Sequence, residues 1–126
     1  MHENDIAKIV VDVAFKMHSN LGPGLFESVH EAVMEYELIH CRRLNIKRQV
    51  AIPVIWKEVK LDIGFRADFI VENKVVIELK AIEALAPVHY KQMLTYLRLT
   101  NHKLGLLINF DENLIKNGIK RIVNGL

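Results

Sequence analysis

The sequence predicts an α/β protein in which a mixed β-sheet is flanked by helices. Apolar residues recur at helical spacing in the first third of the chain and at a spacing of two through its middle. A helical segment then precedes a stretch that is apolar on both sides, which is typical of a parallel strand covered by helices. The expected order is therefore helix, helix, three strands, helix and strand, with a right-handed crossover before the last strand.

Two helices are expected at the start of the chain. Apolar residues repeat from Ile6 to Met17 and predict a helix over about residues 5–19, which the stretch LGPG then ends. The second helix runs to about residue 43. Its start is open, because Ser28 with Glu31 forms a capping box while Gly24 could also begin the turn. The side chains expected on its buried face are Leu25, Val29, Ala32, Val33, Tyr36 and Ile39.

Three strands are expected in the middle of the chain. The first covers about residues 50–56, where Pro53 removes a ladder donor and indicates an edge strand or a bulge. The second covers residues 59–71 with a bend near Gly64. The third covers residues 75–80, after a turn made by residues 72–74.

The last part of the sequence predicts a helix that begins after Pro87 and a buried strand over residues 103–110. The tail at residues 118–124 fits a helix as well as a strand, and we favour a short final strand. No internal repeat or long linker separates these segments, so we expect one domain over residues 1–126.

Composition narrows the class of protein. The chain has 126 residues, is 51% hydrophobic and has a formal net charge of +2, which neither requires nor excludes a polyanionic partner. Its longest apolar runs are shorter than the roughly 20 residues of a membrane-spanning helix, so we expect a soluble, cytoplasmic protein. Cys41 is the only cysteine, which excludes an intramolecular disulfide.

The strand at residues 75–80 carries two charges among apolar neighbours. Glu78 and Lys80 point to one face, while Ile77 and Leu79 point to the other. A three-residue loop before this strand would place Asp68, on the preceding strand, directly opposite Glu78. Opposed β-carbons lie about 4.5 to 5.5 Å apart, close enough for two carboxylates to hold one cation.

Two carboxylates beside an amine suit phosphodiester hydrolysis. Magnesium prefers oxygen ligands at about 2.0 to 2.1 Å and keeps several waters, so such a pair makes an open site. The ion would activate a water and offset charge on the phosphate, while Lys80 would orient that water. The alternative interpretation of Asp68, Glu78 and Lys80 is a structural ion pair at a sheet edge.

The stretch RADFIVENKVVIELKA at residues 66–81 resembles the core motif of the PD-(D/E)XK nuclease superfamily. The stretch LGPGLFESVHEAV is similar to the signature of the small GxxExxY protein family within it, although the final tyrosine is His30 here. The resemblance implies a restriction-endonuclease-like core and a nuclease site that uses Mg²⁺, with Mn²⁺ as a substitute. It also implies that Glu27 is a further catalytic and metal-binding acid. By the same resemblance, Gln92 and Tyr96 correspond to a QxxxY element that borders the site in RecB-like nucleases, so we expect them to contact the substrate. A polar rim with an amphipathic tyrosine is the alternative.

These observations lead to a nuclease acting on nucleic acid, with DNA the favoured substrate and endo- or exonuclease action open. A catalytically silent module that binds nucleic acid or a protein partner is the alternative. Because one small domain offers little surface for gripping a duplex, we expect a homodimer. Glu27 alone would be a helix-start acid. The cationic cluster that includes Arg48 is interpreted as a solvated helix end rather than a phosphate contact.

Overall fold

The computed structural model describes residues 1–61 and 64–126. Its elements, in chain order, are α1 (Glu3–Leu21), α2 (Glu27–Tyr36), a π-helical turn η1 (Glu37–Cys41), β1 (Ile46–Ala51), β2 (Val54–Trp56), β3 (Val59–Leu61), β4 (Arg66–Val71), β5 (Val75–Lys80), α3 (Pro87–Thr100), β6 (Leu104–Asn109), a 3₁₀ turn η2 (Ile115–Asn117) and β7 (Ile119–Val123). Within the described ranges, no helix is both long enough and apolar enough to cross a membrane.

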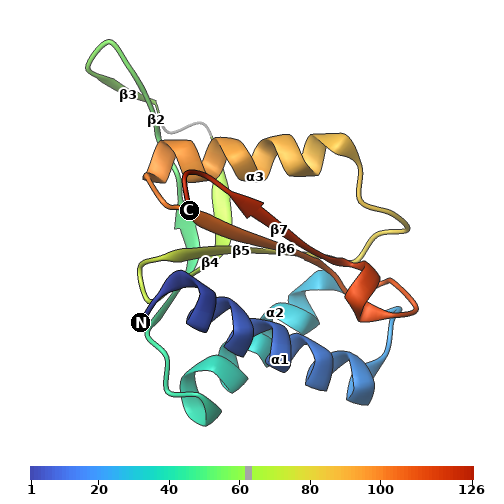
Figure 1. Ribbon diagram of the computed structural model, residues 1–126. Helices are drawn as coiled ribbons and strands as arrows, with labels where there is room; N and C mark the ends of the chain where they lie inside the picture. Colours follow the sequence, from blue (N-terminus) through green and yellow to red (C-terminus); the bar gives the residue numbers. More distant parts are fainter. Residues whose placement is uncertain (62–63) are drawn as a thin grey trace.

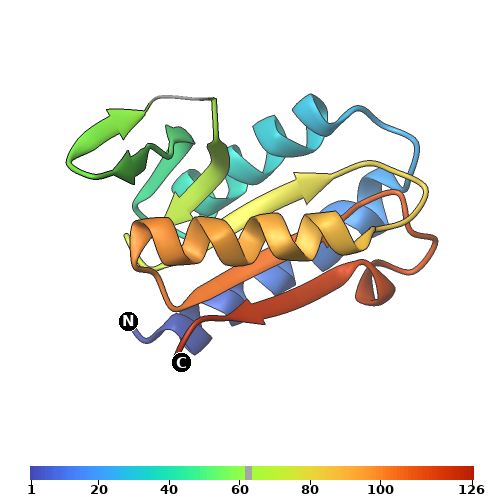
Figure 2. The same ribbon diagram turned by 90° about the horizontal axis from the view of Figure 1, so that it is seen from above.

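A mixed five-stranded sheet with helices on both faces forms the body of the protein (Figures 1 and 2). The strand order is β1-β4-β5-β6-β7, in which β5 and β6 run parallel and the other neighbours run antiparallel. Helices α1 and α2 cover one face, and α3 covers the other (Figure 1). The α/β class, the three predicted segments 75–80, 87–101 and 103–110, and the final strand are thereby confirmed.

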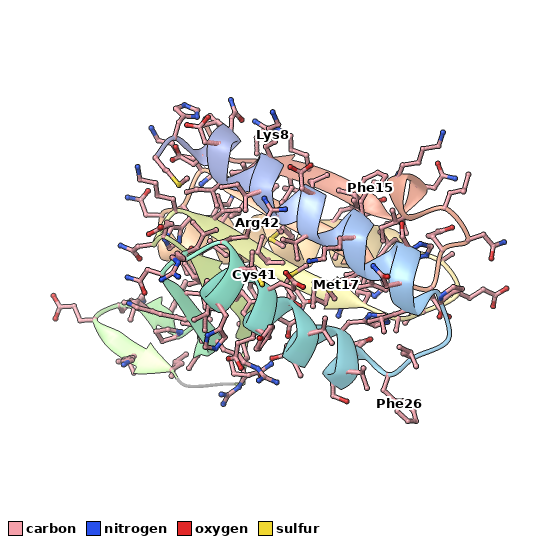
Figure 3. All side chains as sticks on the ribbon, turned by 90° about the horizontal axis from the view of Figure 1, so that it is seen from below. Lys8, Phe15, Met17, Phe26, Cys41 and Arg42 are labelled. Carbon is pink, nitrogen blue, oxygen red and sulfur yellow. The ribbon has the colours of Figure 1, made fainter. Side chains whose placement is uncertain are left out.

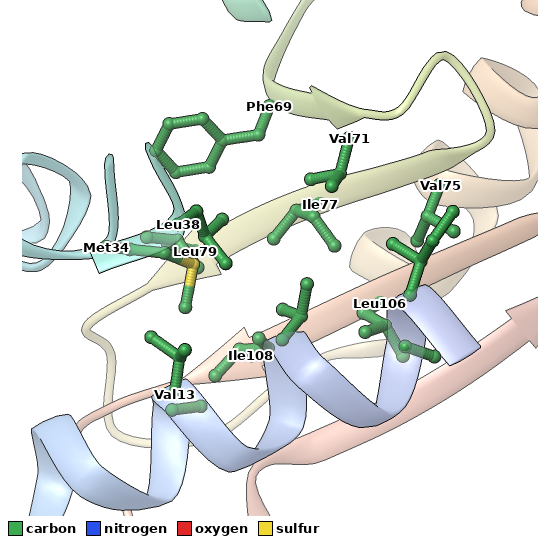
Figure 4. Packing of buried hydrophobic residues seen from close by; sticks show 14 of the residues in the cluster. Val13, Met34, Leu38, Phe69, Val71, Val75, Ile77, Leu79, Leu106 and Ile108 are labelled. Carbon is green, nitrogen blue, oxygen red and sulfur yellow. The ribbon is translucent and has the colours of Figure 1, made fainter. Parts of the chain in front are cut away.

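Alternation along β5 divides the core into two clusters. Ile77 and Leu79 pack with Val13 of α1 and Met34 of α2 on one face (Figure 4). Val76 instead joins the smaller cluster beneath α3. Burying each of these aliphatic side chains contributes about 1.5 to 3 kcal/mol, so both faces anchor β5 firmly. Glu78 and Lys80 continue the face of Val76, on the side of α3.

The first two predicted strands are interrupted. The segment 50–56 breaks at Pro53, so that β1 ends at Ala51 as an edge strand and β2 begins at Val54. The segment 59–71 divides into β3 and β4, and Gly64 between them has a φ of +83°. Residues 62 and 63 of that predicted strand lie outside the described residues. The pieces β2 and β3 pair with each other as a separate hairpin.

The predicted buried face of the second helix is wrong for most of its residues, although Val33 is partly buried and packs against the core. Helix α2 and η1 turn His30, Glu31, Met34 and Leu38 inward, whereas 60% of the surface of Tyr36 is exposed. Phe26 caps α2 without a side-chain hydrogen bond and points away from the body (Figure 3). The error has a physical reason, since the inward face carries polar residues that hydrophobic spacing cannot identify. The Ser28 capping box is also absent, because Glu31 binds elsewhere.

Candidate functional site

Asp68 and Glu78 face each other across β4 and β5. The strands pair Phe69 with Ile77 and Val71 with Val75, so one further step opposes the two acids. This register confirms the predicted three-residue loop, in which Glu72 and Asn73 adopt left-handed φ values of 51° and 54°.

At this point of the sheet, the two carboxylates accept the backbone amides of the opposite strand. The Asp68 amide donates to Glu78 Oε1 at 3.0 Å, and the Leu79 amide donates to Asp68 Oδ2 at 2.8 Å. Each side chain therefore accepts a backbone N–H of the opposite strand, which fixes both carboxylates in orientation. The alternation of side chains along the strands and the length of the loop predicted that Asp68 lies opposite Glu78. They did not predict the hydrogen bonds to the amides of the opposite strand.

Burial and mutual repulsion make it costly to ionise both Asp68 and Glu78. Only 7% of Glu78 is exposed, and burial together with repulsion from Asp68 raises the pKa of Glu78 to about 8. Burial also raises the pKa of Asp68, although the bond from the Leu79 amide opposes that change. At neutral pH the site consequently favours one bound proton, or a cation in its place.

Lys80 lies beside the two acids at the end of β5. It is half-buried on the same face as Glu78, and its charge lowers the pKa of both Asp68 and Glu78. The carbonyl of Lys80 accepts the amide of Phe110 at 2.8 Å, which holds the strand end in place. The action of Lys80 on a bound substrate stays a prediction.

Glu27 reaches the site from the first turn of α2. Its Oε2 accepts the amide of Ala81 at 3.2 Å, and its charge contributes to the raised pKa values of Asp68 and Glu78. Among the described residues, however, no group of three or more His, Cys, Asp or Glu side chains is close enough to hold a metal ion jointly. The structure thus places Glu27 at the border of the Asp68–Glu78 pair, and its role as a third ligand stays a prediction.

Gln49 and Glu31, which the sequence analysis did not assign to the site, complete the surroundings of Asp68. The Gln49 side-chain amide donates to Asp68 Oδ1 at 3.3 Å and to Glu31 Oε1 at 2.5 Å. Glu31 also accepts from Arg48 Nε at 2.8 Å, and Arg48 pairs with Glu35 at 3.1 Å. Arg48 is therefore not a solvated helix end. No signal in the sequence points to Gln49, because only the folded sheet pairs Arg48 with Phe69 and Val50 with Ala67 and so brings the residue between them to Asp68.

Gln92 and Tyr96 lie on the inner side of α3. The Gln92 side-chain amide donates to the Tyr96 hydroxyl at 2.9 Å, and Tyr96 is buried among the apolar residues beneath α3. Burial and then the charge of Glu78 raise the pKa of Tyr96. The predicted proximity of this helix to β5 is thus present in the fold, while substrate contact by these residues stays a prediction.

His30 occupies the inner face of α2 without a hydrogen-bond partner. Its ring stacks on Phe110 with centroids 4.2 Å apart, and neither ring nitrogen has a partner among the described residues. Burial lowers the pKa of His30, so the neutral ring persists at neutral pH. His30 is accordingly a packing residue.

Replacing His30 with phenylalanine should raise the free energy of unfolding by about 1 to 2 kcal/mol, because the stack on Phe110 is kept and two unpaired buried nitrogens are removed. Urea denaturation at pH 7.5 measures the change. His18→Phe is the matched control and should not stabilise, since His18 Nε2 bonds the Glu112 carbonyl at 2.7 Å. A loss of stability in His30→Phe would contradict this description of the ring.

A mixed sheet between helices, with two acids and a lysine on its central strands, defines a restriction-endonuclease-like protein. The family model described as the PD-(D/E)XK nuclease superfamily matches residues 4–122. The chain belongs to this superfamily. Searches among curated proteins and among solved structures found no match. Membership supports a nuclease-type function on nucleic acid, and PD-(D/E)XK nucleases typically use divalent metals.

Proposed function

We propose that the protein is a divalent-metal-dependent nuclease that hydrolyses phosphodiester bonds, with DNA as the favoured substrate. The observation that supports this most is the pair of buried, mutually repelling carboxylates of Asp68 and Glu78. A pair that merely stabilised the sheet would be matched by a neighbouring cation in a direct ion pair. Here each carboxylate accepts a backbone amide of the opposite strand, and among the described residues neither forms an ion pair.

The donor set fits a hard divalent cation. Carboxylate oxygens are the ligands that Mg²⁺ prefers, and one or two of them suffice when waters fill the remaining positions. Asp68 and Glu78 would hold the ion, with Glu27 as a further acid at its edge. A cation between Asp68 and Glu78 would also relieve the repulsion that raises the pKa of Glu78. Mg²⁺ is proposed as the native ion, and Mn²⁺ as its substitute.

The chain's own residues have separable roles in this proposal. The bound ion supplies charge neutralisation on the phosphate and activates a water. Lys80 orients the attacking water or stabilises negative charge on the phosphoryl oxygens. Gln92 and Tyr96 contact the substrate from α3. The reciprocal amide bonds of Asp68 and Glu78 keep the acids in place without reorganisation during the reaction.

Within the superfamily, we place the chain in the GxxExxY family on the similarity of residues 21–33 to that signature. Glu27, its central acid, reaches the end of β5, which agrees with a role at the site. His30 stands at the tyrosine position and packs on Phe110. We also propose a homodimer, so that two copies together present enough surface for a duplex.

One observation favours a second function, that of a silent module that binds nucleic acid without cleaving it. The Glu27 carboxylate bonds the Ala81 amide, and within the described ranges no third acid joins Asp68 and Glu78 at coordinating distance. A site limited to two carboxylates would hold its ion more weakly. This candidate predicts nucleic-acid binding that is independent of Mn²⁺ and unchanged by Glu78→Ala.

Cleavage assays distinguish the two functions. Purified protein should cut at least one of duplex, single-stranded and branched DNA when Mg²⁺ or Mn²⁺ is present, and chelation should stop the reaction. The same panel made of RNA tests the nucleic-acid class. Absence of metal-dependent cleavage on every substrate, combined with retained binding, would favour the silent module.

A further inference from the structure

The β2–β3 hairpin projects from the body beside α3 (Figure 1). Its strands pair only with each other within the described part of the chain. Cross-strand partners share a face, so Val54, Leu61, Trp56 and Val59 form one apolar face. Of the Trp56 surface, 64% is exposed. A two-stranded hairpin alone is only marginally stable in water, so a bound molecule that covers this apolar face would stabilise the hairpin.

Cations accompany these apolar side chains. The Lys57 ammonium lies 5.7 Å from the centre of the Trp56 ring, and Lys60 stands on the opposite face of the hairpin. At the foot of the hairpin, Arg66 is exposed and donates one hydrogen bond to the Gln49 carbonyl. Lysine is depleted at protein–protein interfaces, whereas aromatic rings beside cations are typical of surfaces that bind single-stranded nucleic acid.

A pocket of about 460 Å³ lies at the foot of the hairpin. Its described lining consists of Ala51, Ile52, Lys60, Gly64, Phe65 and Arg66, which includes two cations, one aromatic ring and no carboxylate. A ligand of complementary chemistry is an anion that carries a planar group. A nucleotide unit of a single strand has both parts.

Phe65 links this pocket to the side of α3 that faces β5. Phe65 also lines a second opening, of about 290 Å³, with Lys91, Gln92 and Tyr96. The rings of Phe65 and Tyr96 contact edge to face with centroids 5.9 Å apart. The charge of Glu78 raises the pKa of Tyr96. Arg66 and Asp68 share a face of β4, about 6.6 Å apart along the strand. A strand of nucleic acid can thus pass from the hairpin to the acids.

We propose that the β2–β3 hairpin and the pocket at its foot bind an unpaired nucleotide of the substrate next to the cleavage site. Its phosphates pair with Lys60 and Arg66 at the pocket. The base of the neighbouring unpaired nucleotide stacks on Trp56, which lies on the other face of the hairpin. This subsite rests on the proposed nuclease function and names its substrate class as nucleic acid with a single-stranded segment. A second copy of the chain is the weaker occupant, because four apolar side chains supply far less than the roughly 800 Å² per partner of a stable dimer.

Trp56 is the only tryptophan of the chain, so its fluorescence reports the subsite directly. The full-length protein is titrated with a short oligothymidylate in EDTA, where cleavage is stopped and binding alone is measured. We expect quenching of Trp56 and a dissociation constant that rises about tenfold or more in Trp56→Ala and in Lys60→Glu. Trp56→Phe should keep most of the affinity. Lys8→Glu, an exposed charge reversal on α1, is the matched control and should lose much less.

The possible results separate the subsite from the nuclease. Quenching with loss of affinity in Trp56→Ala supports the subsite even if no cleavage is found. Cleavage that proceeds normally in Trp56→Ala, with no quenching in the wild type, overturns the subsite and leaves the nuclease standing. Equal affinity for a duplex, or a dimer in sedimentation that Trp56→Ala dissociates while oligothymidylate has no effect, also overturns it. Circular dichroism confirms that the exposed replacements fold.

Discussion

Replacing Glu78 with glutamine should lower metal-dependent cleavage by about a thousandfold or more, because the ion loses one of its two charged ligands. The same change should stabilise the protein. The Glu78 carboxyl has its pKa raised to about 8 by burial and by Asp68, so ionising it costs free energy that a neutral amide does not. Near pH 8 the gain should be roughly 2 to 4 kcal/mol in the free energy of unfolding.

The stabilisation expected for Glu78→Gln should grow as the pH rises. A carboxyl whose folded pKa is raised binds more protons in the folded than in the unfolded state between its ordinary pKa and about 8. Its contribution is present at low pH and is lost as pH rises toward 8. Wild type should thus lose up to about 1.4 kcal/mol per pH unit between pH 7 and 8, and Glu78→Gln should not. This window avoids the opposite effect of His30, whose pKa is lowered.

Urea denaturation in EDTA measures the stability, and cleavage of the best substrate measures the activity. Asp12→Asn, an exposed neutralisation on α1, is the matched control and should alter neither quantity by much. A Glu78→Gln protein that is less stable than wild type at pH 8 would contradict the description of Asp68 and Glu78 as repelling acids. If Glu78→Gln kept its cleavage activity, Glu78 would not be a catalytic residue.

Replacing Lys80 with methionine should lower the rate of cleavage by about a hundredfold or more while leaving ion binding intact at pH 9. The length and apolar stem of the side chain are kept, and the charge that acts on the phosphate or the attacking water is lost. Because Lys80 lowers the pKa of Asp68 and Glu78, its removal should also raise the proton affinity of the pair. Mn²⁺ binding should therefore weaken near pH 7 and recover, or tighten, at pH 9.

Rapid single-turnover cleavage and Mn²⁺ titration at two pH values separate these effects. Lys8→Met is the control, since Lys8 is exposed on α1. If Lys80→Met lost Mn²⁺ affinity equally at both pH values, Lys80 would support the carboxylates structurally instead of acting on the substrate. Unchanged cleavage would remove Lys80 from the reaction.

Local patterns predicted β5 and its partners well, since Ile77 and Leu79 alternate with Glu78 and Lys80. The three-residue loop then set the register that opposes Asp68 and Glu78. The face of α2 was predicted wrongly because its inward side includes His30 and Glu31, whose burial depends on Phe110 and on Gln49. Such contacts join segments that are distant along the chain, and spacing within one helix carries no information about them.

The reciprocal amide bonds and the hairpin were beyond local reasoning for a similar reason. Asp68 and Glu78 end the β4–β5 ladder by taking each other's backbone amides, which requires both strands in place. Residues 50–71 read as two long strands, whereas Pro53 and Gly64 allow β2 and β3 to leave the sheet together. Pro53 and Gly64 are visible in the sequence, but only the sheet shows that both breaks lie at the same end of the paired strands β1 and β4.

We propose that Asp68 and Glu78 share a proton that a divalent cation replaces. Calorimetric titration of the apo protein with Mn²⁺ at pH 7, in buffers of different ionisation enthalpy, counts the protons released on binding. We predict binding with release of between about half a proton and one proton in wild type, and no comparable binding in Glu78→Gln. Binding without proton release, or the same titration in Glu78→Gln, would contradict the claim.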